Sequence, residues 1–357
     1  MRILHICGSF EKGGVTAFVK NMLVLNSEFV STHDLMVIHE SNEVEAPGGA
    51  TIYNMTRDLS FFKAGTFYSI FSQYEGIIIH KAHPALLIPL MRCAASKLIF
   101  QHGMTMSKGG ALKKAIKGTW YSQLPRLLKA KVVCSTQYAL EKARLSGIEI
   151  ADSDAFITPF GIDLKRKETP KEYGAPLKSR LVVGTAGRLE EIKRFGLLLQ
   201  SLMNYSGRPI ELRIAGEGNL RGELEALAAK LPTAHVQVQF TGNLSDLIPF
   251  YDDLDIFVFP SHNESFGLVV VEALARNIPV AVFPDIGGAL EVMEDEKNGF
   301  VMKPGKEGLK ELWDKLDNNP EILSTMSQYI CNTDLSVYNI IATRKTMDNL
   351  IRKMKLS

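Results

Sequence analysis

Two glutamates, Glu264 and Glu272, stand eight positions apart on either side of Gly267, in the stretch FPSHNESFGLVVVEALARNIPVAVFPDIGG. At about 3.6 residues per turn, the helix predicted after Gly267 lets both carboxylates face one cleft, while its free amides favour an anion. Acidic residues near a helix start are favourable in themselves, and such pairs also arise by chance. Glu272, however, interrupts the apolar run LVVVEALA, where an unpaired carboxylate is costly. A ribose diol would be a suitable partner for it.

Short apolar runs on both sides predict a strand, helix and strand unit around these glutamates. Residues 255–260 (DIFVFP) and 278–283 (IPVAVF) have the length and composition of buried strands, and the helix is expected over residues 267–276. In an open parallel sheet, the loops that follow the strands lie at the carboxyl edge, where ligands bind. Glu264 belongs to such a loop.

A second pair of charges follows the strand predicted at residues 181–185. This strand leads into AGRLEEIKR, where Gly187 closes the turn and Arg188 and Lys193 flank a helix start. Two cations at this place can clamp a diphosphate. A solvated helix start with both side chains at the surface explains the pattern equally well.

The strands predicted at residues 211–215 and 236–240 also end in glycine, the first at Gly216 in GEGN. Glycine lets a backbone approach a ligand closely, so several such loops are expected along one edge of the second sheet. The acids Asp253 and Asp255 stand at the other end of their strand. They are interpreted as a solvated strand entry rather than as a metal site.

The first part of the chain also predicts an α/β domain with a mostly parallel sheet. The strand at residues 2–7 is followed by GSFEKGG and a helix from about residue 15 to residue 25. Gly13 and Gly14 allow close approach to a ligand, but their spacing does not match GxGxxG, and a plain tight turn is an equal alternative. Further strands are predicted at residues 34–39, 50–54, 76–80, 97–101, 131–135 and 155–158.

His102 directly follows the strand predicted at residues 97–101, which places an imidazole at the ligand edge of the first sheet. A hydrogen-bonded structural histidine is the alternative. After it, residues 107–140 contain no acidic residue at all. The stretch is interpreted either as a solvated face or as a surface that docks on anionic lipid. The basic residues are Lys108, Lys113, Lys114, Lys117, Arg126, Lys129 and Lys131, around Trp120 and Tyr121.

Length and composition predict the domain plan. The 357 residues fit two domains, 1–162 and 181–335, joined by a charged linker over 163–180 and followed by a C-terminal helix over 336–357. A net charge of +2 gives no indication of nucleic acid, and four dispersed cysteines indicate neither a disulfide framework nor a zinc site. Without a signal peptide or a long apolar run, a cytoplasmic protein is expected, peripheral to the inner membrane if the basic surface docks there.

Taken in order, these motifs resemble the retaining glycosyltransferases of family 4, or glycosyl transferases group 1. The resemblance is strongest in GRLEEIKR, in LRIAGEGNLRGELEALA and in FTGNLSDLIPFYDDLDIFVFPSHNESFGLVVVEALARNIPVAV, followed by GG. It implies the GT-B architecture, with two Rossmann-like α/β domains facing each other across a cleft and the last helix packing back on the N-terminal domain.

The resemblance also implies an activity. The N-terminal domain would bind a glycan or polyprenyl-diphosphate-linked acceptor, and the C-terminal domain a nucleotide-diphosphate sugar, as in bacterial surface polysaccharide biosynthesis. Arg188 and Lys193 would hold the diphosphate, so that neither metal nor cofactor is needed, Glu272 would bind the ribose, and Glu264 would touch the sugar. The residues so placed are Gly13, Gly14, His102, Gly187, Arg188, Lys193, Gly216, Glu264, Phe266, Gly267, Leu268 and Glu272.

Some positions depart from the family pattern. Thr16 stands where an acid is common, Phe160 where asparagine is usual, and Ser265 and Asn277 replace frequent glycines. The changes at Thr16 and Phe160 bear on the N-terminal loop and the hinge. Two rival functions remain: a sugar-nucleotide epimerase or hydrolase of the same fold, and a catalytically silent subunit, although the charged motif residues are all present.

Overall fold

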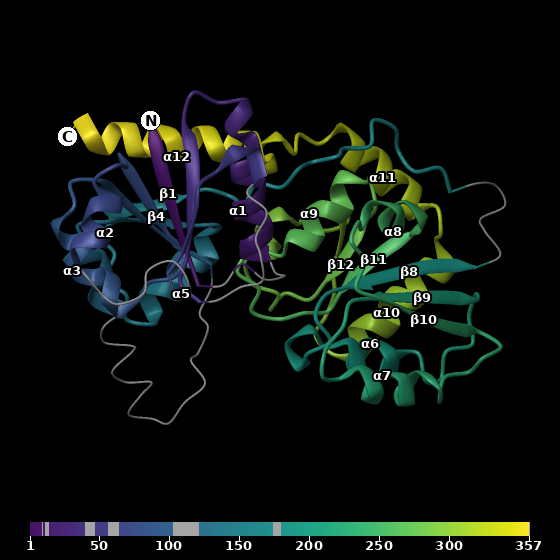
Figure 1. Ribbon diagram of the computed structural model, residues 1–357. Coiled ribbons are helices and arrows are strands. Elements are labelled where there is room, and N and C mark those ends of the chain that lie inside the picture. Colours follow the sequence, from purple (N-terminus) through teal and green to yellow (C-terminus); the bar gives the residue numbers. More distant parts are fainter. Residues whose placement is uncertain are drawn as a thin grey trace. The chain divides into compact units, whose positions relative to one another are not determined.

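The computed structural model describes residues 1–8, 10, 14–39, 47–55, 64–102, 121–173 and 180–356. The chain forms two compact units (Figure 1). Unit 1 comprises Met1–Asp163 and Ser336–Ser357, and unit 2 comprises Leu164–Leu335. Gly13 and the predicted basic residues from Lys108 to Lys117 lie outside the described residues, as does Trp120.

Unit 1 is built on a parallel sheet of seven strands in the order β3-β2-β1-β4-β5-β6-β7. Its central strands are buried along most of their length, as expected for a sheet covered on both faces. The strands are β1 (Arg2–Cys7), β2 (Thr32–Val37), β3 (Ile52–Asn54), β4 (Gly76–Ile79), β5 (Ser96–Gln101), β6 (Lys131–Cys134) and β7 (Ala155–Ile157), and the helices between them include α1 (Gly14–Val24), α2 (Ala64–Phe71), α3 (Leu87–Arg92) and α5 (Gln137–Leu145).

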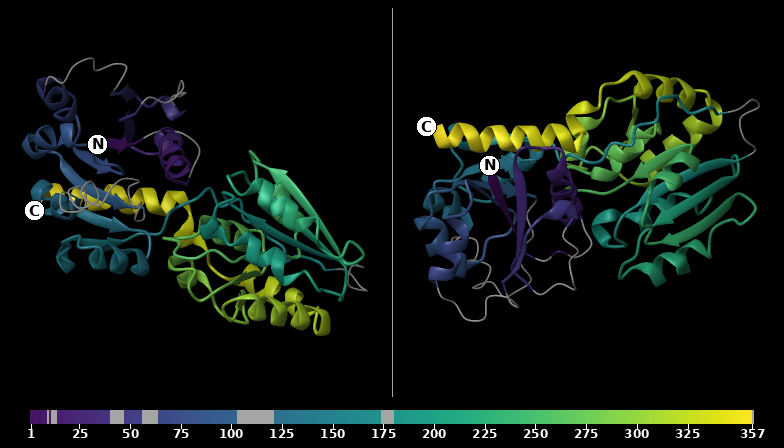
Figure 2. Two further views of the ribbon diagram at one scale, coloured as in Figure 1. Left: turned by 90° about the horizontal axis from the view of Figure 1, so that it is seen from below. Right: turned by 45° about the horizontal axis from the view of Figure 1, so that its top comes forward.

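The C-terminal helix α12 (Ile340–Leu356) belongs to unit 1, where it packs against α1 and β5 (Figure 2). Its approach to β4 is close, because a Cβ atom added to Gly76 would lie 2.7 Å from the side chain of Ile351. Thr343 Oγ1 also donates a hydrogen bond to the carbonyl oxygen of Pro159, at 3.1 Å. The last helix thus packs on the N-terminal sheet, as the resemblance implied.

Unit 2 contains a second parallel sheet, of six strands in the order β10-β9-β8-β11-β12-β13 (Figure 1). The two Rossmann-like halves predicted from the sequence are therefore confirmed. The strands are β8 (Leu181–Ala186), β9 (Ile210–Ala215), β10 (Val236–Gly242), β11 (Ile256–Phe259), β12 (Val280–Val282) and β13 (Gly299–Val301), and the helices are α6 (Phe195–Ser201), α7 (Arg221–Ala228), α8 (Ile248–Asp253), α9 (Leu268–Ala275), α10 (Lys306–Asn318) and α11 (Ile322–Asn332).

The described part of the segment between the domains packs on unit 2. The backbone N–H of Lys171 donates to Ser327 Oγ at 2.7 Å, and the buried Tyr173 donates its hydroxyl to the carbonyl oxygen of Asp255 at 2.9 Å. The prediction of a solvated entry is wrong for Asp255, which is 2% exposed. Its carboxylate accepts the N–H of Val182 at 2.9 Å and lies 3.9 Å from the ammonium of Lys171, so it joins β8 to β11.

Candidate active site

The strand order of unit 2 defines where a ligand would bind. In order along the chain, β8 is the first strand of this sheet and β11 the fourth, and they are neighbours in the sheet. After β8 the chain continues to β9 on one side, and after β11 it continues to β12 on the other. The loops after β8 and β11 therefore diverge at the carboxyl edge, which is the topological switch point of a doubly wound sheet.

Lys193 and Glu264 meet at this switch point. Lys193 ends the 3-10 turn Glu191–Lys193 after β8, Glu264 lies in the loop after β11, and Nζ is 2.6 Å from Oε1. The two side chains are only 16% and 18% exposed, and the ammonium lies 4.9 Å from the ring centre of Phe259. A Lys ammonium has three hydrogens to donate, so this pairing leaves donors for a second, anionic partner.

The backbone holds Glu264 in place. Its N–H donates to the carbonyl oxygen of Ile286 at 2.6 Å, and its own carbonyl oxygen accepts the N–H of Gly288 at 2.8 Å. Ser261 Oγ donates to Glu264 Oε1, the same oxygen that Lys193 contacts. Within the described ranges Glu264 Oε2 has no hydrogen-bond partner, and this oxygen is therefore the one that can accept a ligand hydroxyl.

Arg188 lies on the same loop as Lys193 but is much more exposed. Its guanidinium side chain is 77% exposed and pairs with Glu190 Oε1 at 2.8 Å. An exposed pair of this kind contributes at most about 1 kcal/mol, so Arg188 can readily exchange it for an anionic ligand. Arg194, in contrast, donates from both terminal nitrogens to Asp285, at 2.9 and 2.6 Å, and ties the two loops together.

Glycines let the loops after β8, β9 and β10 pack backbone against backbone. Gly187 donates its N–H to Ala215 at 2.9 Å, and Gly216 donates to Gly242 at 2.8 Å. Gly216 has a φ of +129°, and a Cβ atom added there would lie 2.0 Å from the carbonyl oxygen of Gly187. No other residue type fits at Gly216, which explains in physical terms the repeated glycine that ends these strands.

Helix α9 begins beside the Glu264 loop. Gly267 precedes it with a φ of +79°, and a Cβ atom added there would lie 2.7 Å from that of Ala289. Among the described residues no side chain caps the helix. The N–H of Val270 donates to the carbonyl oxygen of Gly267 at 2.9 Å, which leaves the N–H groups of Leu268 and Val269 for an anion. Phe266, just before it, is 3% exposed.

Glu272 is held by a tyrosine that the sequence did not single out. The hydroxyl of Tyr251, on α8, donates to Glu272 Oε2 at 2.9 Å. Burial raises the pKa of Glu272 above its ordinary value, and the Tyr251 hydrogen bond partly offsets this effect. Burial and the neighbouring Glu272 also raise the pKa of Tyr251 well above 10, so the phenol keeps its proton and remains a donor. Glu272 Oε1 has no such partner in the described part of the chain.

His102 lies in unit 1, directly after β5. Its ring stacks on Phe100 and Phe160, with centroid distances of 4.7 and 4.8 Å. Phe160, one of the departures from the family pattern, therefore covers the active-site candidate of this unit. His102 Nε2 is 2.5 Å from His80 Nδ1, while its own Nδ1 is buried without a partner among the described residues.

The structure brings some of the predicted residues together and separates others. Lys193 and Glu264 are in direct contact, with Arg188 on the same loop, whereas Glu272 has a partner of its own. Sequence reasoning missed Ser261 and Tyr251. A serine three residues before Glu264 and a tyrosine in the preceding helix are visible in the sequence, but only the folded loops show that they contact these carboxylates.

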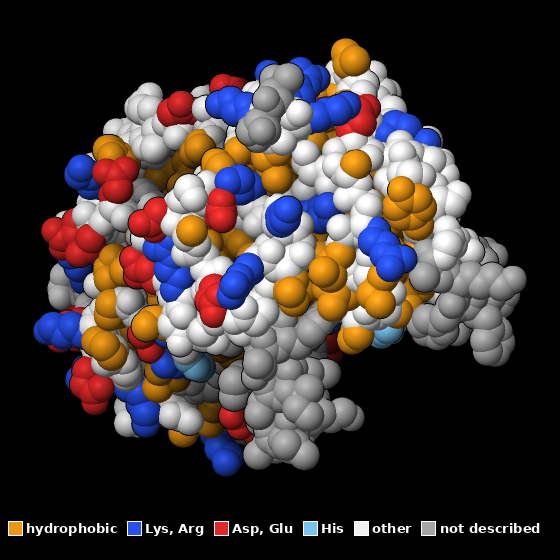
Figure 3. All heavy atoms as spheres, turned by 90° about the vertical axis from the view of Figure 1, so that its left-hand side faces the viewer, with side chains coloured by type: hydrophobic (Ala, Val, Ile, Leu, Met, Phe, Trp, Pro, Cys, Tyr) orange, Lys and Arg blue, Asp and Glu red, His pale blue; other side chains and the backbone are white. Residues whose placement is uncertain are grey.

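The predicted basic surface lies partly within the described residues. Of its described members, Arg126 and Lys129 are exposed, while Lys131 pairs with Asp154 at 2.5 Å. Figure 3 shows one face of the molecule, on which Lys and Arg side chains lie among Asp and Glu side chains. Every helix in the described ranges is too short or too polar to cross a membrane. The same ranges contain no cluster of three His, Cys, Asp or Glu side chains suited to a metal.

The residues that build this site lie in a segment that matches a known protein family. Residues 165–332, which include both loops of the switch point, match the family described as Glycosyl transferases group 1. Over these residues, the chain is similar to the glycosyl transferases group 1 family. The match contains Arg188, Lys193, Glu264 and Glu272.

Individual glycosyltransferases are also similar to this chain. It is 27% identical over 202 residues to the capsular polysaccharide biosynthesis glycosyltransferase CapM of Staphylococcus aureus, covering 56% of this chain and 52% of CapM. It is 31% identical over 162 residues to an uncharacterized glycosyltransferase of Haemophilus influenzae, covering 44% and 45%. The chain thus spans about half the length of these curated relatives.

The fold of the chain also matches solved structures along its whole length. HepE of Anabaena, solved in complex with UDP and glucose, superposes with a TM-score of 0.77 at 16% identity, covering 99% of this chain and 100% of HepE. At this identity the likeness establishes the fold alone, namely the two-domain α/β architecture of GT-B glycosyltransferases.

Proposed function

We propose that the protein is a retaining glycosyltransferase that moves a sugar from a nucleotide-diphosphate donor to a glycan or lipid-linked acceptor. The observation that carries the proposal is the Lys193–Glu264 pair at the switch point of unit 2, a cation and a carboxylate 2.6 Å apart within the group 1 match. The match to HepE, which was solved with UDP and glucose, supports a donor of this class. CapM, by its name, points to polysaccharide biosynthesis.

The residues of unit 2 supply what such a reaction needs. When the bond between sugar and diphosphate breaks, negative charge develops on the leaving phosphate. Lys193, Arg188 and the uncapped start of α9 are positive groups that stabilise this charge, and on this account no metal ion is required. Glu272 Oε1 accepts a ribose hydroxyl and Glu264 Oε2 a hydroxyl of the donor sugar.

The resemblance to family 4 implies retention of the anomeric configuration, and the engagement of the two glutamates bears on how retention arises. A double-displacement mechanism requires a carboxylate nucleophile beside the anomeric carbon. Glu264 is engaged by Lys193 and Ser261, and Glu272 is assigned to the ribose. Retention then arises by front-face transfer, in which the leaving phosphate accepts the proton of the acceptor hydroxyl. Unit 1, which contains His102, binds the acceptor.

A panel of nucleotide sugars tests this function directly. The protein is expected to consume one UDP- or GDP-linked sugar faster when a glycan or polyprenyl-diphosphate acceptor is present, and to keep its rate in EDTA. Consumption that is independent of every acceptor would favour the rival epimerase or hydrolase. Loss of activity in EDTA with recovery on adding Mg²⁺ would contradict the metal-independent mechanism.

The two glutamates are expected to affect different kinetic constants. A ribose contact exists in both the bound substrate and the transition state, so Glu272→Gln should mainly raise the KM of the donor, and Tyr251→Phe should do the same to a smaller extent. A contact to the reacting sugar strengthens as charge develops, so Glu264→Gln should mainly lower kcat. Steady-state kinetics with varied donor measure both constants, and the opposite pattern would exchange the two roles.

The acceptor side leads to a membrane proposal. The basic stretch from Lys108 to Lys131 docks unit 1 on anionic lipid, where each cation contributes about 1 kcal/mol near the headgroups. The protein is expected to sediment with liposomes that contain anionic lipid and to be released as salt is raised. Replacing the described, exposed Arg126 and Lys129 with glutamate should weaken sedimentation. Equal, salt-insensitive recovery with neutral liposomes would leave a soluble acceptor as the better assignment.

A further inference from the structure

Four histidines form a row across the sheet of unit 1. His33 lies on β2, His5 on β1, His80 directly after β4 and His102 directly after β5, and these four strands are consecutive neighbours in the sheet. In the sheet register, His5 stands two residues beyond the position opposite His33, and His80 stands two residues beyond the position opposite His5. Because side chains alternate between the faces, this stagger keeps the rings on one face and moves the row toward the carboxyl edge.

Adjacent rings in the row are within hydrogen-bond distance through their nitrogens. His33 Nδ1 is 2.7 Å from His5 Nε2, His5 Nδ1 is 2.8 Å from His80 Nε2, and His80 Nδ1 is 2.5 Å from His102 Nε2. Ring centroids along the row are 4.8 to 5.1 Å apart. Each of the three inner contacts uses the Nδ1 of one ring and the Nε2 of the next, in the same order.

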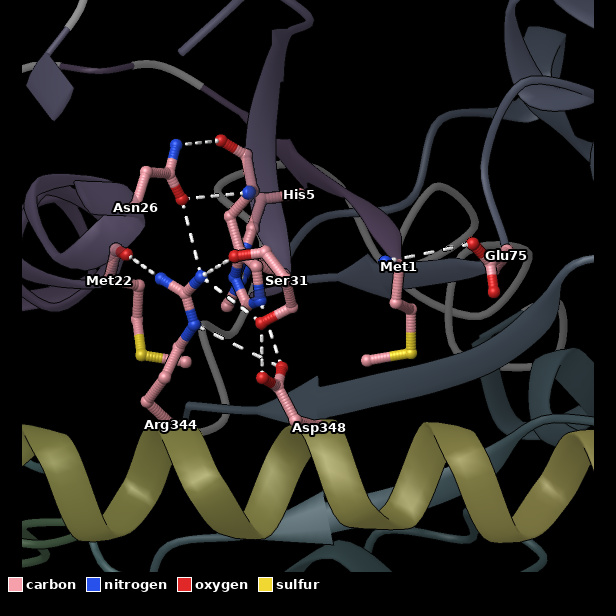
Figure 4. A network of polar contacts seen from close by, with 10 residues as sticks. Met1, His5, Met22, Asn26, Ser31, Glu75, Arg344 and Asp348 are labelled. Carbon is pink, nitrogen blue, oxygen red and sulfur yellow. Dashed lines mark hydrogen bonds and ion pairs between the residues drawn. The ribbon is translucent and has the colours of Figure 1, made fainter. Parts of the chain in front are cut away.

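The row begins at a carboxylate on the C-terminal helix. Asp348, on α12, has Oδ1 3.1 Å from His33 Nε2, and Ser31 Oγ donates to its other oxygen (Figure 4). Arg344, one helical turn earlier, lies 3.9 Å from the same carboxylate and is fully buried. Burial opposes ionisation of Asp348, but hydrogen bonds from His33 and Ser31 outweigh it and hold its pKa below the ordinary value. Asp348 is therefore an anion that can only accept hydrogen bonds.

The four imidazoles are neutral at physiological pH. Burial lowers the pKa of His33 to about 4 and that of His80 to about 3. Burial, reinforced by the neighbouring histidines, also lowers the pKa of His5 and His102 well below 6.5. A neutral imidazole carries one hydrogen, so one ring nitrogen donates and the other accepts.

Asp348 can only accept, and each neutral imidazole donates from one nitrogen and accepts at the other. Together these two facts fix the direction of every hydrogen bond in the row. Since Asp348 only accepts, His33 must carry its hydrogen on Nε2, which leaves Nδ1 to accept from His5 Nε2. The same step repeats from His5 to His80 and from His80 to His102. His102 therefore carries its hydrogen on Nε2, and its Nδ1 presents a lone pair. That Nδ1 is the buried atom that has no partner in the described part of the chain.

We propose that His33, His5 and His80 are positioning residues through which Asp348 fixes the tautomer of His102, so that His102 Nδ1 is kept as an acceptor for a substrate hydroxyl. The proposal rests on the proposed function for the identity of that hydroxyl, a sugar or acceptor alcohol. On this proposal, helix α12 contributes to the chemistry of unit 1 through Asp348, although the helix lies at the end of the chain. A tautomer fixed in advance costs no reorganisation when the substrate binds.

Ring-nitrogen NMR of histidine labelled with ¹⁵N tests the arrangement without any substrate. Protonated and unprotonated ring nitrogens resonate far apart, so each tautomer is read directly. In the wild-type protein His33, His5, His80 and His102 are all expected to carry hydrogen on Nε2. A hydrogen on Nδ1 of His102 would overturn the proposal, and this result needs no variant.

Two substitutions at His5, which does not touch His102, test the transmission. His5→Phe removes both the donor and the acceptor in the middle of the row, which frees His80 and lets His102 shift its hydrogen toward Nδ1. His5→Gln keeps an N–H donor and a carbonyl acceptor, so His102 should retain the wild-type tautomer. Met36→Ala is the matched control, because Met36 is fully buried on the same sheet but on the opposite face of β2 from His33. It should leave the tautomer unchanged.

Kinetics then link the row to transfer. His5→Phe is expected to lower kcat about tenfold or more, the usual scale for losing an outer hydrogen-bond partner of a site residue, with little change in donor KM. His5→Gln should recover most of the rate, and Met36→Ala should be near wild type. An unchanged His102 tautomer in His5→Phe, or a shifted tautomer with unchanged kcat, overturns the proposal. Absence of transfer by the wild-type protein with every donor would count against the proposed function alone, since the NMR result decides the tautomer by itself.

Discussion

Lys193→Ala is expected to lower the turnover of the donor by about a hundredfold or more, which corresponds to roughly 3 kcal/mol of lost transition-state stabilisation. Lys193 is the cation held at the switch point, and its ammonium is the least exposed positive charge on the loop after β8. Arg188→Ala should lower turnover in the same direction. Steady-state rates of sugar transfer measure the effect.

A matched lysine controls for loss of charge alone. Lys303 is 72% exposed and pairs with Glu311 at 2.7 Å, away from the loops after β8 and β11. Lys303→Ala should therefore transfer sugar at the wild-type rate. Circular dichroism should show the same fold in all these variants. Wild-type turnover in Lys193→Ala would mean that the diphosphate is bound elsewhere.

Arg344→Met is expected to lower the free energy of unfolding by about 3–5 kcal/mol, because it leaves the buried Asp348 without its cation. Burial lowers the pKa of Arg344 to about 10, so the guanidinium is still charged at neutral pH. It also donates to the carbonyl oxygens of Met22 and Ser31, the latter at 2.6 Å, and so fastens α12 to the first part of the chain (Figure 4). Denaturant unfolding followed by circular dichroism measures the change.

Arg352 provides the comparison on the same helix. It is exposed, so Arg352→Met should change the free energy of unfolding by no more than about 0.5 kcal/mol. Similar unfolding curves for the Arg344 and Arg352 variants would show that the buried network contributes little to the docking of α12.

Much of the fold could be predicted because its signals are local. Buried parallel strands are short apolar runs, and β11 and β12 lie within the runs predicted at residues 255–260 and 278–283. The prediction for β1 agrees at both ends. The glycine that follows β9 is also a local signal, in this case for a loop with close backbone packing. The structure shows why glycine is needed there, because a Cβ atom at Gly216 would collide with the carbonyl oxygen of Gly187. Resemblance to a family added the order of the domains.

The contacts inside the site could not be predicted, because they depend on loop conformation and on strand register. Lys193 and Glu264 are 71 positions apart, and their contact follows from β8 and β11 being neighbours. Asp348 is 315 positions from His33. Asp255 lies in an acidic segment that is typical of a solvated turn. In the structure, however, its carboxylate is buried and accepts the backbone N–H of Val182. In each case a side chain meets a partner that only the folded sheet supplies.

The central claim is that the Lys193–Glu264 switch point binds the nucleoside diphosphate of the donor. Isothermal titration calorimetry of UDP, and separately of GDP, into the wild-type protein, Lys193→Ala and Lys303→Ala tests it most directly. We predict that one nucleotide binds the wild type and Lys303→Ala equally, and that Lys193→Ala weakens its affinity about tenfold or more, the loss of roughly one charged hydrogen bond. Equal affinity in Lys193→Ala, or no binding of either nucleotide to the wild type, would contradict the account.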